Sequence, residues 1–193
     1  MSWRFYFKEE AAYTNKMAPP IFFLLDRSGS MDSIRDDVIG GYNAFINDQK
    51  NLTPDALATL WQFDNEILVT YENITMRDAP LLSRETYCPR GGTHLLDTLG
   101  KALDVPPVAE PPMIIIFTDG EENGSTKFSK SQIKEKITQR TSEGWTFVYM
   151  GANQDAFAEA GDIGIGPAAT VNFDVTRTPD AFRTLSAAAS QRV

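Results

Sequence analysis

Apolar residues occur along this chain in two kinds of pattern, continuous runs and helical repeats. Continuous runs at residues 21–25, 113–118 and 145–150 have the length of strands that are buried on both faces. Elsewhere apolar residues recur every three or four positions, which indicates amphipathic helices. This second pattern predicts helices at residues 33–50, 95–103, 130–143, 153–160 and 180–192.

Three further segments complete the predicted sheet. Residues 56–63 and 66–71 are expected to form a hairpin through Asp64-Asn65, and residues 170–173 a short strand. Strands that alternate with helices predict an α/β fold of the doubly wound, Rossmann-like kind. We expect a mostly parallel central sheet of about six strands, one of them antiparallel near an edge, with helices on both faces.

Two segments carry weaker signals. Gly40-Gly41 inside the first predicted helix lowers helix stability, which indicates close packing against the sheet. Residues 72–92 show little periodicity and are expected to wrap an edge or an end of the sheet.

The first residues differ from the rest and are separated from them by Pro19-Pro20. In this segment Trp3, Phe5 and Phe7 alternate with other residues, a period of two that is typical of a strand. The segment is therefore either an added edge strand or a poorly ordered leader, with Met17 as a possible start. We divide the chain into an extension at residues 1–18 and a single domain at residues 19–193, since 193 residues suit one core.

The charge and the cysteine content narrow the class of protein. A net charge of -8 and a pI near 4.7 argue against nucleic acid or an anionic membrane as the main partner. Cys88 is the single cysteine and His94 the single histidine, so an internal disulfide and a His/Cys zinc site are excluded. No apolar run approaches the roughly 18 residues of a membrane span, and no signal peptide is recognised. We expect a cytoplasmic protein.

Oxygen-bearing side chains follow two of the buried runs. Asp26, Ser28 and Ser30 occupy alternate positions after the first run, and Asp119 follows the run at 113–118. Ligands of open α/β sheets bind at the carboxyl ends of such strands. Thr93 follows a glycine pair and opens a helix, and it joins the cluster if that helix packs beside the first strand. These ligands suit Mg²⁺, Mn²⁺ or Ca²⁺, with nothing soft enough for zinc.

These donors lie in three motifs that occur in a known order. The motifs are Asp26-Arg27-Ser28-Gly29-Ser30-Met31, Gly91-Gly92-Thr93 and Phe117-Thr118-Asp119-Gly120. In this order and context they resemble the metal-ion-dependent adhesion site of von Willebrand factor type A domains. The resemblance covers about residue 19 to the C-terminus and is to small stand-alone bacterial or phage members, some associated with tellurium-resistance and stress operons.

The resemblance implies a role for each of the five positions. It implies that Ser28 and Ser30 bind the metal directly, that Thr93 does so in some states, and that Asp26 and Asp119 act largely through water. Neutral hydroxyls with only two carboxylates leave coordination positions to water, and an Asp or Glu of a partner can replace one. We therefore predict a metal-dependent protein–protein interaction module, with Mg²⁺ as the preferred cation, and no enzymatic activity.

Other functions are weighed against this one. The first alternative is a structural or scaffold subunit that uses the N-terminal segment, with the metal site secondary. The second is a metal-dependent phosphate-processing enzyme, but a dehalogenase-type phosphotransferase needs an acid where Ser28 stands. An EF-hand fails because Met31 occupies the position that requires glycine. Cys88 and His94 as nucleophile and base are less expected than a packing residue and a surface residue.

Two simpler interpretations concern the surroundings of the site. The Asp-x-Ser-x-Ser segment would also suit a turn that caps the next helix. The charged or titratable neighbours are interpreted as solvated loop residues; they are Arg27, Arg90, His94, Glu121 and Glu122. In integrin-type relatives the C-terminal helix moves with the metal site, but we expect the helix at residues 180–192 to be static packing.

Overall fold

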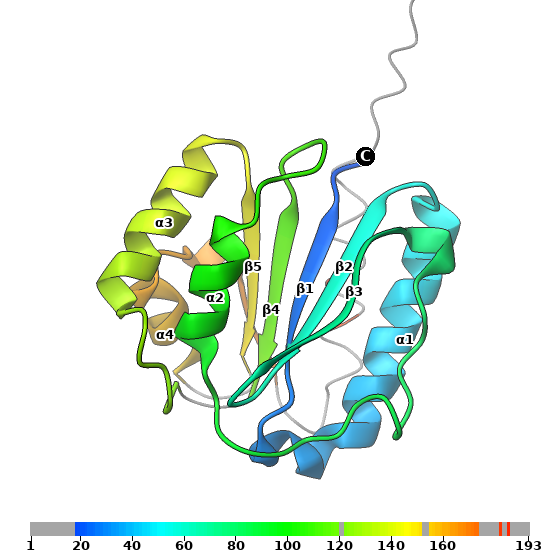
Figure 1. The fold of residues 1–193 in the computed structure, drawn as a ribbon, viewed down its shortest axis with the longest axis horizontal. Helices are drawn as coiled ribbons and strands as arrows, with labels where there is room; N and C mark the ends of the chain where they lie inside the picture. Colours follow the sequence, from blue (N-terminus) through cyan, green and yellow to red (C-terminus); the bar gives the residue numbers. More distant parts are fainter. Residues whose placement is uncertain (1–17, 120–121, 152–154, 174–181, 183–184, 186–193) are drawn as a thin grey trace, which may run out of the picture.

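We describe the protein from a computed structural model. The structure describes residues 18–119, 122–151 and 155–173, together with Phe182 and Leu185. Six strands form one sheet in the order β3-β2-β1-β4-β5-β6 (Figure 1). They are β1 Ile21–Asp26, β2 Leu57–Phe63, β3 Ile67–Thr75, β4 Met113–Thr118, β5 Thr146–Gly151 and β6 Thr170–Asn172.

The strand pairing confirms the predicted fold class. β1 pairs in parallel with β2 and with β4, and β5 pairs in parallel with β4 and with β6. β3 is antiparallel to β2 and forms an edge of the sheet. The carboxyl ends of β1 and β4 therefore lie next to each other, where the strand order reverses direction and where α/β sheets bind ligands.

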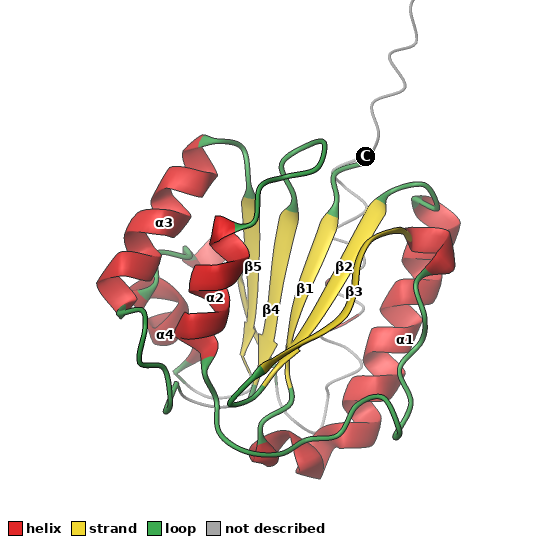
Figure 2. Cartoon of the chain, viewed as in Figure 1, coloured by secondary structure: helices red, strands yellow, loops and turns green. Residues whose placement is uncertain are grey.

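Helices cover both faces of the sheet (Figure 2). The chain leaves β1 through a 3₁₀ helix, Gly29–Ile34, and continues into α1 on one face. α2, α3 and α4 lie on the other face. The α-helices are α1 Arg35–Leu52, α2 Leu95–Asp104, α3 Lys130–Ser142 and α4 Ala156–Asp162, and short 3₁₀ helices occur at Met76–Asp78 and Pro167–Ala169.

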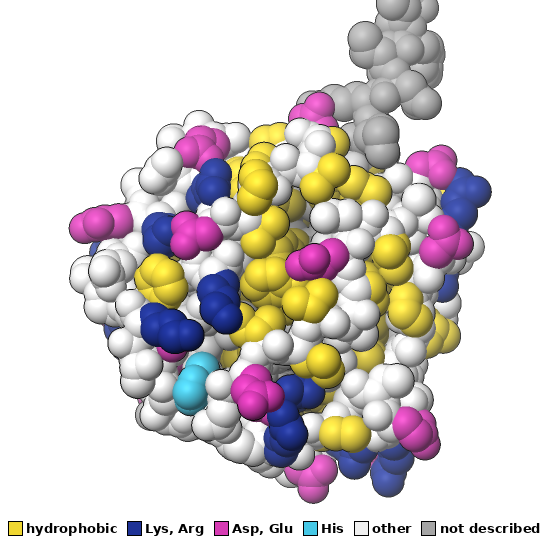
Figure 3. Space-filling model, viewed as in Figure 1, with side chains coloured by type: hydrophobic (Ala, Val, Ile, Leu, Met, Phe, Trp, Pro, Cys, Tyr) yellow, Lys and Arg dark blue, Asp and Glu magenta, His cyan; other side chains and the backbone are white. Residues whose placement is uncertain are grey.

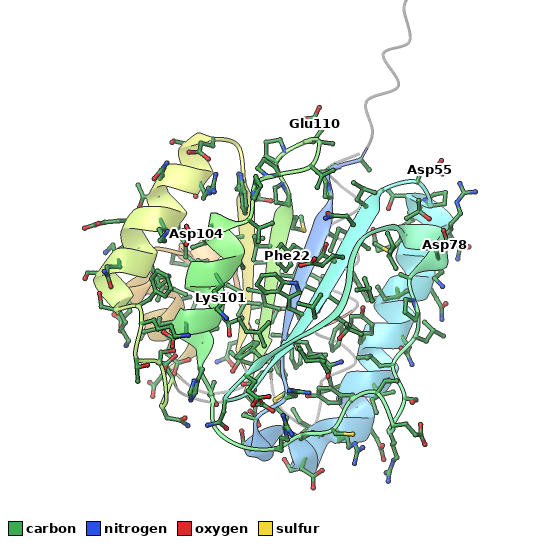
Figure 4. The ribbon with its side chains drawn as sticks, in the orientation of Figure 1. Phe22, Asp55, Asp78, Lys101, Asp104 and Glu110 are labelled. Atoms are coloured by element: carbon green, nitrogen blue, oxygen red, sulfur yellow. The ribbon has the colours of Figure 1, made fainter. Side chains whose placement is uncertain are left out.

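The alternation of side chains along β1 divides the core into two layers. Phe23 and Leu25 pack with α1, whereas Phe22 and Leu24 pack on the side of α2 and α3. Because both layers bury apolar residues, all six residues of β1 are buried, as its continuous apolar run predicts. Phe22 lies near the middle of the face seen in Figure 4. Apolar side chains gather in the middle of this face, and charged ones lie mainly around its margin (Figure 3).

The segment between β3 and α2 wraps an end of the sheet, as predicted. β3 is longer than expected and includes residues 72–75. Beyond it, Asn43 of α1 exchanges two hydrogen bonds with the backbone of Leu82, at 2.9 and 2.7 Å. The chain then crosses the carboxyl ends of the strands to reach α2 (Figure 1). This crossing brings the residues before Thr93 to the end of β1.

The glycine pair in α1 has two different environments. Gly41 is buried, and a Cβ atom there would lie 2.2 Å from Cδ2 of Phe182. Gly40 is exposed, and a Cβ atom there would meet nothing within 4 Å. Gly41 is therefore closely packed as predicted, but against the side chain of Phe182 and not against the sheet, and the prediction is wrong for Gly40.

Other predictions fall wholly or partly outside the described residues. The extension at residues 1–18 is described only at Ala18. Of the helix predicted at residues 180–192, Phe182 and Leu185 are described, and both are buried. Within the described part of the chain, no helix is long and apolar enough to cross a membrane.

Candidate metal site

Asp26 ends β1 and is fully buried. Its Oδ1 accepts a hydrogen bond from the backbone N–H of Ser28 at 2.6 Å, and its Oδ2 accepts one from the hydroxyl of Thr118 at 2.6 Å. Its backbone carbonyl accepts a third from the hydroxyl of Tyr87, also at 2.6 Å. These three bonds hold the carboxylate at the junction of β1, β4 and the loop before α2.

A chain of oxygen atoms connects the end of β1 with the end of β4. The Oγ atoms of Ser28 and Ser30 are 3.1 Å apart, and the hydroxyl of Ser30 donates to Oδ1 of Asp119 at 2.7 Å. Ser28 is buried, whereas Ser30 is exposed. The cluster is therefore buried at Asp26 and Ser28 and exposed to solvent at Ser30.

Thr93 belongs to a loop that contacts the first motif through Gly91. Its loop lies against the first motif, because the N–H of Gly29 donates to the carbonyl of Gly91 at 3.1 Å. Thr93 itself is buried and exchanges two bonds with Asn123: its N–H donates to Oδ1 at 2.9 Å, and its carbonyl accepts the N–H at 3.1 Å. Four of the five predicted donors are thus linked directly by hydrogen bonds, and Thr93 lies in the adjoining loop.

Burial makes both carboxylates of the cluster harder to ionise than exposed ones. Burial raises the pKa of Asp26 to about 6, although the bonds from Thr118 and Ser28 oppose this rise; the charge of Asp119 adds to it. Burial likewise raises the pKa of Asp119, against the bond from Ser30. A cation placed between such groups would favour their ionised forms, because opposite charge at short range stabilises a carboxylate.

The donor set fits a small, hard cation. Mg²⁺ binds six oxygens at about 2.0–2.1 Å, so neighbouring ligand atoms of an octahedron lie about 2.9 Å apart. The two contacts along the Ser28–Ser30–Asp119 chain, 3.1 and 2.7 Å, lie on either side of that value. Within the described part of the chain, no group of three or more His, Cys, Asp or Glu side chains could hold a metal ion. A cation site here therefore depends on hydroxyl ligands.

Three contacts of the cluster were not anticipated from the sequence. Thr118 lies within the third motif, yet its bond to Asp26 requires β4 to be the neighbour of β1. Tyr87 and Asn123 belong to loops without periodicity, so no pattern marked them as partners of Asp26 and Thr93. For Tyr87, which is buried, the available signal was the residue type, since a buried Tyr hydroxyl usually has a hydrogen-bond partner. Asn123 is exposed, so its type gave no such signal.

The interpretation of the neighbouring charges as solvated is wrong for Arg27. Its side chain is buried, with 9% of its surface exposed, and its Nε lies 3.1 Å from Oδ2 of Asp64. Arg90 is largely exposed but donates from Nε to the same oxygen at 2.8 Å. Asp64 is itself buried. The positive charge of Arg27 is therefore balanced by the carboxylate of Asp64 in the hairpin turn and not by solvent.

Glu122 is also bound within the protein. Its Oε1 accepts the backbone N–H groups of Gly124 and Ser125 at 2.8 and 2.6 Å, and its Oε2 accepts that of Leu96 at 2.8 Å. It therefore satisfies a donor in the first turn of α2, where a negative charge is favourable. Glu121 lies outside the described residues.

Cys88 and His94 have different surroundings. The Sγ atom of Cys88 lies 3.4 Å from the carbonyl oxygen of Arg84, while Nε2 of His94 lies 3.3 Å from Nδ2 of Asn65. Among the described residues, neither side chain has a hydrogen bond to the other. His94 is half-buried between the hairpin turn and the loop at Gly124, whereas Cys88 is exposed, so the expectation of a packing residue is wrong for Cys88.

No protein-family model matches the chain, and no curated protein sequence matches it. Solved structures do resemble it. The von Willebrand factor domain of the type V pilus tip protein Mfa5 from Porphyromonas gingivalis has a TM-score of 0.65 at 13% identity, with 89% of this chain and 95% of that chain covered. This chain has the von Willebrand factor type A fold. The manganese-loaded TRAP protein of Plasmodium vivax has a TM-score of 0.62 at 22% identity, with 88% and 73% covered.

A third similar structure holds a metal ion. It is proximal thread matrix protein 1 from the mussel byssus with a zinc-occupied metal-ion-dependent adhesion motif, at a TM-score of 0.63 and 13% identity. The match covers 88% of this chain but 47% of the mussel protein. A von Willebrand factor type A protein from Catenulispora acidiphila is covered to 43%. This chain thus spans less than half the length of these two proteins.

Proposed function

We propose that this protein is a metal-dependent protein-binding module of the von Willebrand factor type A kind. A divalent cation would be held by Ser28 and Ser30, with Thr93, Asp26 and Asp119 as further or water-mediated ligands. The observation that carries the proposal is the oxygen chain from Ser28 through Ser30 to Asp119, because it joins two strand ends with ligand-like spacing. The bound cation supplies a Lewis-acidic position for an outside carboxylate.

The spacing of the donors favours a small octahedral cation over Ca²⁺, and we propose Mg²⁺ as the preferred one, with Mn²⁺ as the alternative. All the proposed ligand atoms are oxygens, and the contacts between them have the short spacing of a compact octahedron. Zn²⁺ belongs among the cations to be tested, since the mussel protein holds zinc in its motif and the Plasmodium protein is loaded with manganese.

The partner that suits this site is a protein that presents an Asp or Glu. Ser30 is exposed, so the cation would face solvent on that side. Two carboxylates just balance a divalent charge, which leaves water ligands that an incoming carboxylate can replace. Because the whole chain has a net charge of -8, the cation would supply the local positive charge that an acidic group needs in order to bind at this site. The names of similar structures, which include a pilus adhesin and a pilus tip protein, suit a binding role and no catalytic one.

Cation binding and partner binding are tested separately. Isothermal titration calorimetry with Mg²⁺, Mn²⁺, Ca²⁺ and Zn²⁺ should give saturable binding to the wild type and none to Asp26→Ala or Asp119→Ala. Capture of partner proteins from a native lysate, with Mg²⁺ or with EDTA, should then depend on the metal and on both residues. Capture that persists in EDTA and in both variants would overturn the metal-mediated function.

The proposal also covers the location of the protein in the cell and the group of relatives to which it belongs. We propose that the protein acts in the cytoplasm and that its relatives are the small stand-alone members associated with tellurium resistance. The single cysteine, Cys88, is compatible with a reducing compartment, and the three motifs carry the resemblance. Fractionation of the native cells is the direct test of the location.

A further inference from the structure

The turn between β2 and β3 contacts both loops that carry the proposed ligands. Asp64 follows β2, and its carboxylate is buried. One oxygen, Oδ1, accepts the N–H of Glu66 at 2.7 Å, which is a bond within the hairpin turn itself. The other, Oδ2, faces two arginines from outside the hairpin, with Arg27 Nε at 3.1 Å and Arg90 Nε at 2.8 Å.

These two arginines are the sequence neighbours of the ligand motifs. Arg27 stands between Asp26 and Ser28, and Arg90 precedes the glycine pair that leads to Thr93. The two loops also meet directly, because the N–H of Arg90 donates to the carbonyl of Arg27 at 2.7 Å. The carboxylate of Asp64 therefore connects the two segments through their side chains, by an ion pair with Arg27 and a hydrogen bond from Arg90.

Asn65, the second residue of the turn, extends the same contact. Its Oδ1 accepts the N–H of Gly92 at 2.8 Å, and its Nδ2 lies 3.3 Å from Nε2 of His94. Gly91 has a φ of +67°, and a Cβ atom at that position would lie 2.0 Å from Oδ1 of Asn65. The close approach of the turn thus requires glycine at position 91, directly before the segment that carries Thr93.

A hairpin by itself does not account for these contacts. The turn is closed by the bonds between Asp64 and Glu66, and neither Oδ2 of Asp64 nor the amide of Asn65 contributes to that closure. Burying a carboxylate and an arginine costs free energy that good pairing only partly returns. Closing the hairpin therefore does not explain why the charges of Asp64 and Arg27 are buried here.

We propose that the Asp64-Asn65 turn is a positioning element that sets the loop of Ser28 and Ser30 against the loop of Thr93. The turn touches the residues beside the proposed ligands and not the ligands themselves, so it acts through the loops. Its consequence for cation affinity rests on the function proposed above, whereas its effect on the loops does not. Removal of groups that bond directly to metal ligands typically weakens metal binding by about 10- to 100-fold, and we expect the lower end of that range for a turn that acts through the loops.

Arg90→Gln separates positioning from simple electrostatics. The substitution removes a positive charge near the site, so Coulomb attraction alone predicts tighter binding of a cation. Loss of the bond to Asp64 predicts weaker binding. Arg90 is suited to this test because 60% of its side-chain surface is exposed, which limits damage to the fold. Arg77→Gln is the matched control, since Arg77 is 55% exposed and pairs with Asp55 at the opposite end of the sheet (Figure 4).

The experiment measures cation affinity and loop order in the same four proteins. They are the wild type, Arg90→Gln, Asn65→Ala and Arg77→Gln. Calorimetric titration with Mg²⁺ should show a dissociation constant raised about 10-fold in Arg90→Gln and in Asn65→Ala, and unchanged within about twofold in Arg77→Gln. Amide exchange without metal should be at least about tenfold faster at Gly29 in both site variants, because its acceptor, Gly91, lies between Arg90 and Gly92, which are both bonded to the turn.

The outcomes distinguish this proposal from the function on which it builds. Tighter or unchanged Mg²⁺ binding in both site variants, or unchanged exchange at Gly29 in both, would overturn the positioning role. A wild type that binds none of the tested cations would overturn the proposed function. Exchange at Gly29 would still decide, in that case, whether the turn orders the two loops. If Arg90→Gln does not fold, the Mg²⁺ affinity and the exchange rate of Asn65→Ala, which removes no charge, decide the test.

Discussion

The bond between Thr118 and Asp26 gives the most direct test of how the site is built. Thr118→Val removes the hydroxyl and keeps the branched shape that suits β4. The two oxygens are 2.6 Å apart, both residues are buried, and the acceptor is a carboxylate, so the bond is of the short, charge-assisted kind. Hydrogen bonds to charged groups contribute about 1.5–3 kcal/mol to stability.

The expected loss in the free energy of unfolding is therefore about 2 kcal/mol. A domain of this size should show a fall in Tm of about 4–8 °C for that loss. The measurement is urea denaturation at pH 7.5 in EDTA, so that Asp26, with its pKa of about 6, is ionised and no cation intervenes. Thr98→Val is the control, since that buried hydroxyl donates to a neutral carbonyl, of His94, at 2.8 Å. Its expected cost is about 1 kcal/mol.

A double-mutant cycle with Asp26→Ala isolates this bond from any other contact of Thr118. We expect a coupling energy of about 1.5–3 kcal/mol between the two positions. A coupling energy under about 0.5 kcal/mol would show that the bond does not hold the carboxylate, and the reasoning from burial and distance would be refuted.

Three further predictions concern metal, pH and packing. Mg²⁺ at about 100 times its dissociation constant should stabilise the fold by about 2.7 kcal/mol in thermal scans, and a shift that persists in Asp119→Ala would contradict the site. Burial alone would raise the pKa of Asp97, but the N–H groups of residues 126–128 outweigh it and lower the pKa. Stability from Asp97 is therefore present above its unfolded pKa, about 3.9, and is lost as pH falls through the lower folded value. Urea denaturation between pH 7 and pH 3 should show this loss in the wild type and not in Asp97→Asn; parallel profiles would refute it. Gly40→Ala should stabilise α1 by about 1 kcal/mol, whereas Gly41→Ala should destabilise by about 1–3 kcal/mol because of Phe182, and equal effects would disprove the packing difference.

The strands and the fold class were predictable because burial leaves a direct mark on sequence. A strand covered on both faces is a continuous apolar run, as β1 is up to Leu25 and β4 up to Phe117. The hairpin turn was also recognisable, since Asp64-Asn65 separates two apolar segments. The end of β3 was not, because its residues 72–75 lie at an edge and carry no clear alternation.

The order of the oxygen donors along the chain was likewise a property of sequence. Each candidate follows a buried run or a glycine pair, so its type and spacing suffice to propose a cation site. That proposal names the donors but not what holds them. The bond from Thr118 to Asp26, and the contact of Ser30 with Asp119, depend on β4 lying beside β1.

Only the tertiary structure shows which charged side chains near the site are paired within the protein and which face solvent. From sequence, Arg27 resembles any loop arginine, yet it is buried against Asp64, a residue 37 positions away in the chain. Local patterns report burial and turns, because these depend on neighbouring residues. They do not report which distant loops meet, because that depends on strand order and on how far each loop reaches across the end of the sheet. The sequence by itself determined the donors and the strands of this protein, and the packing of strand ends determined how the donors are held.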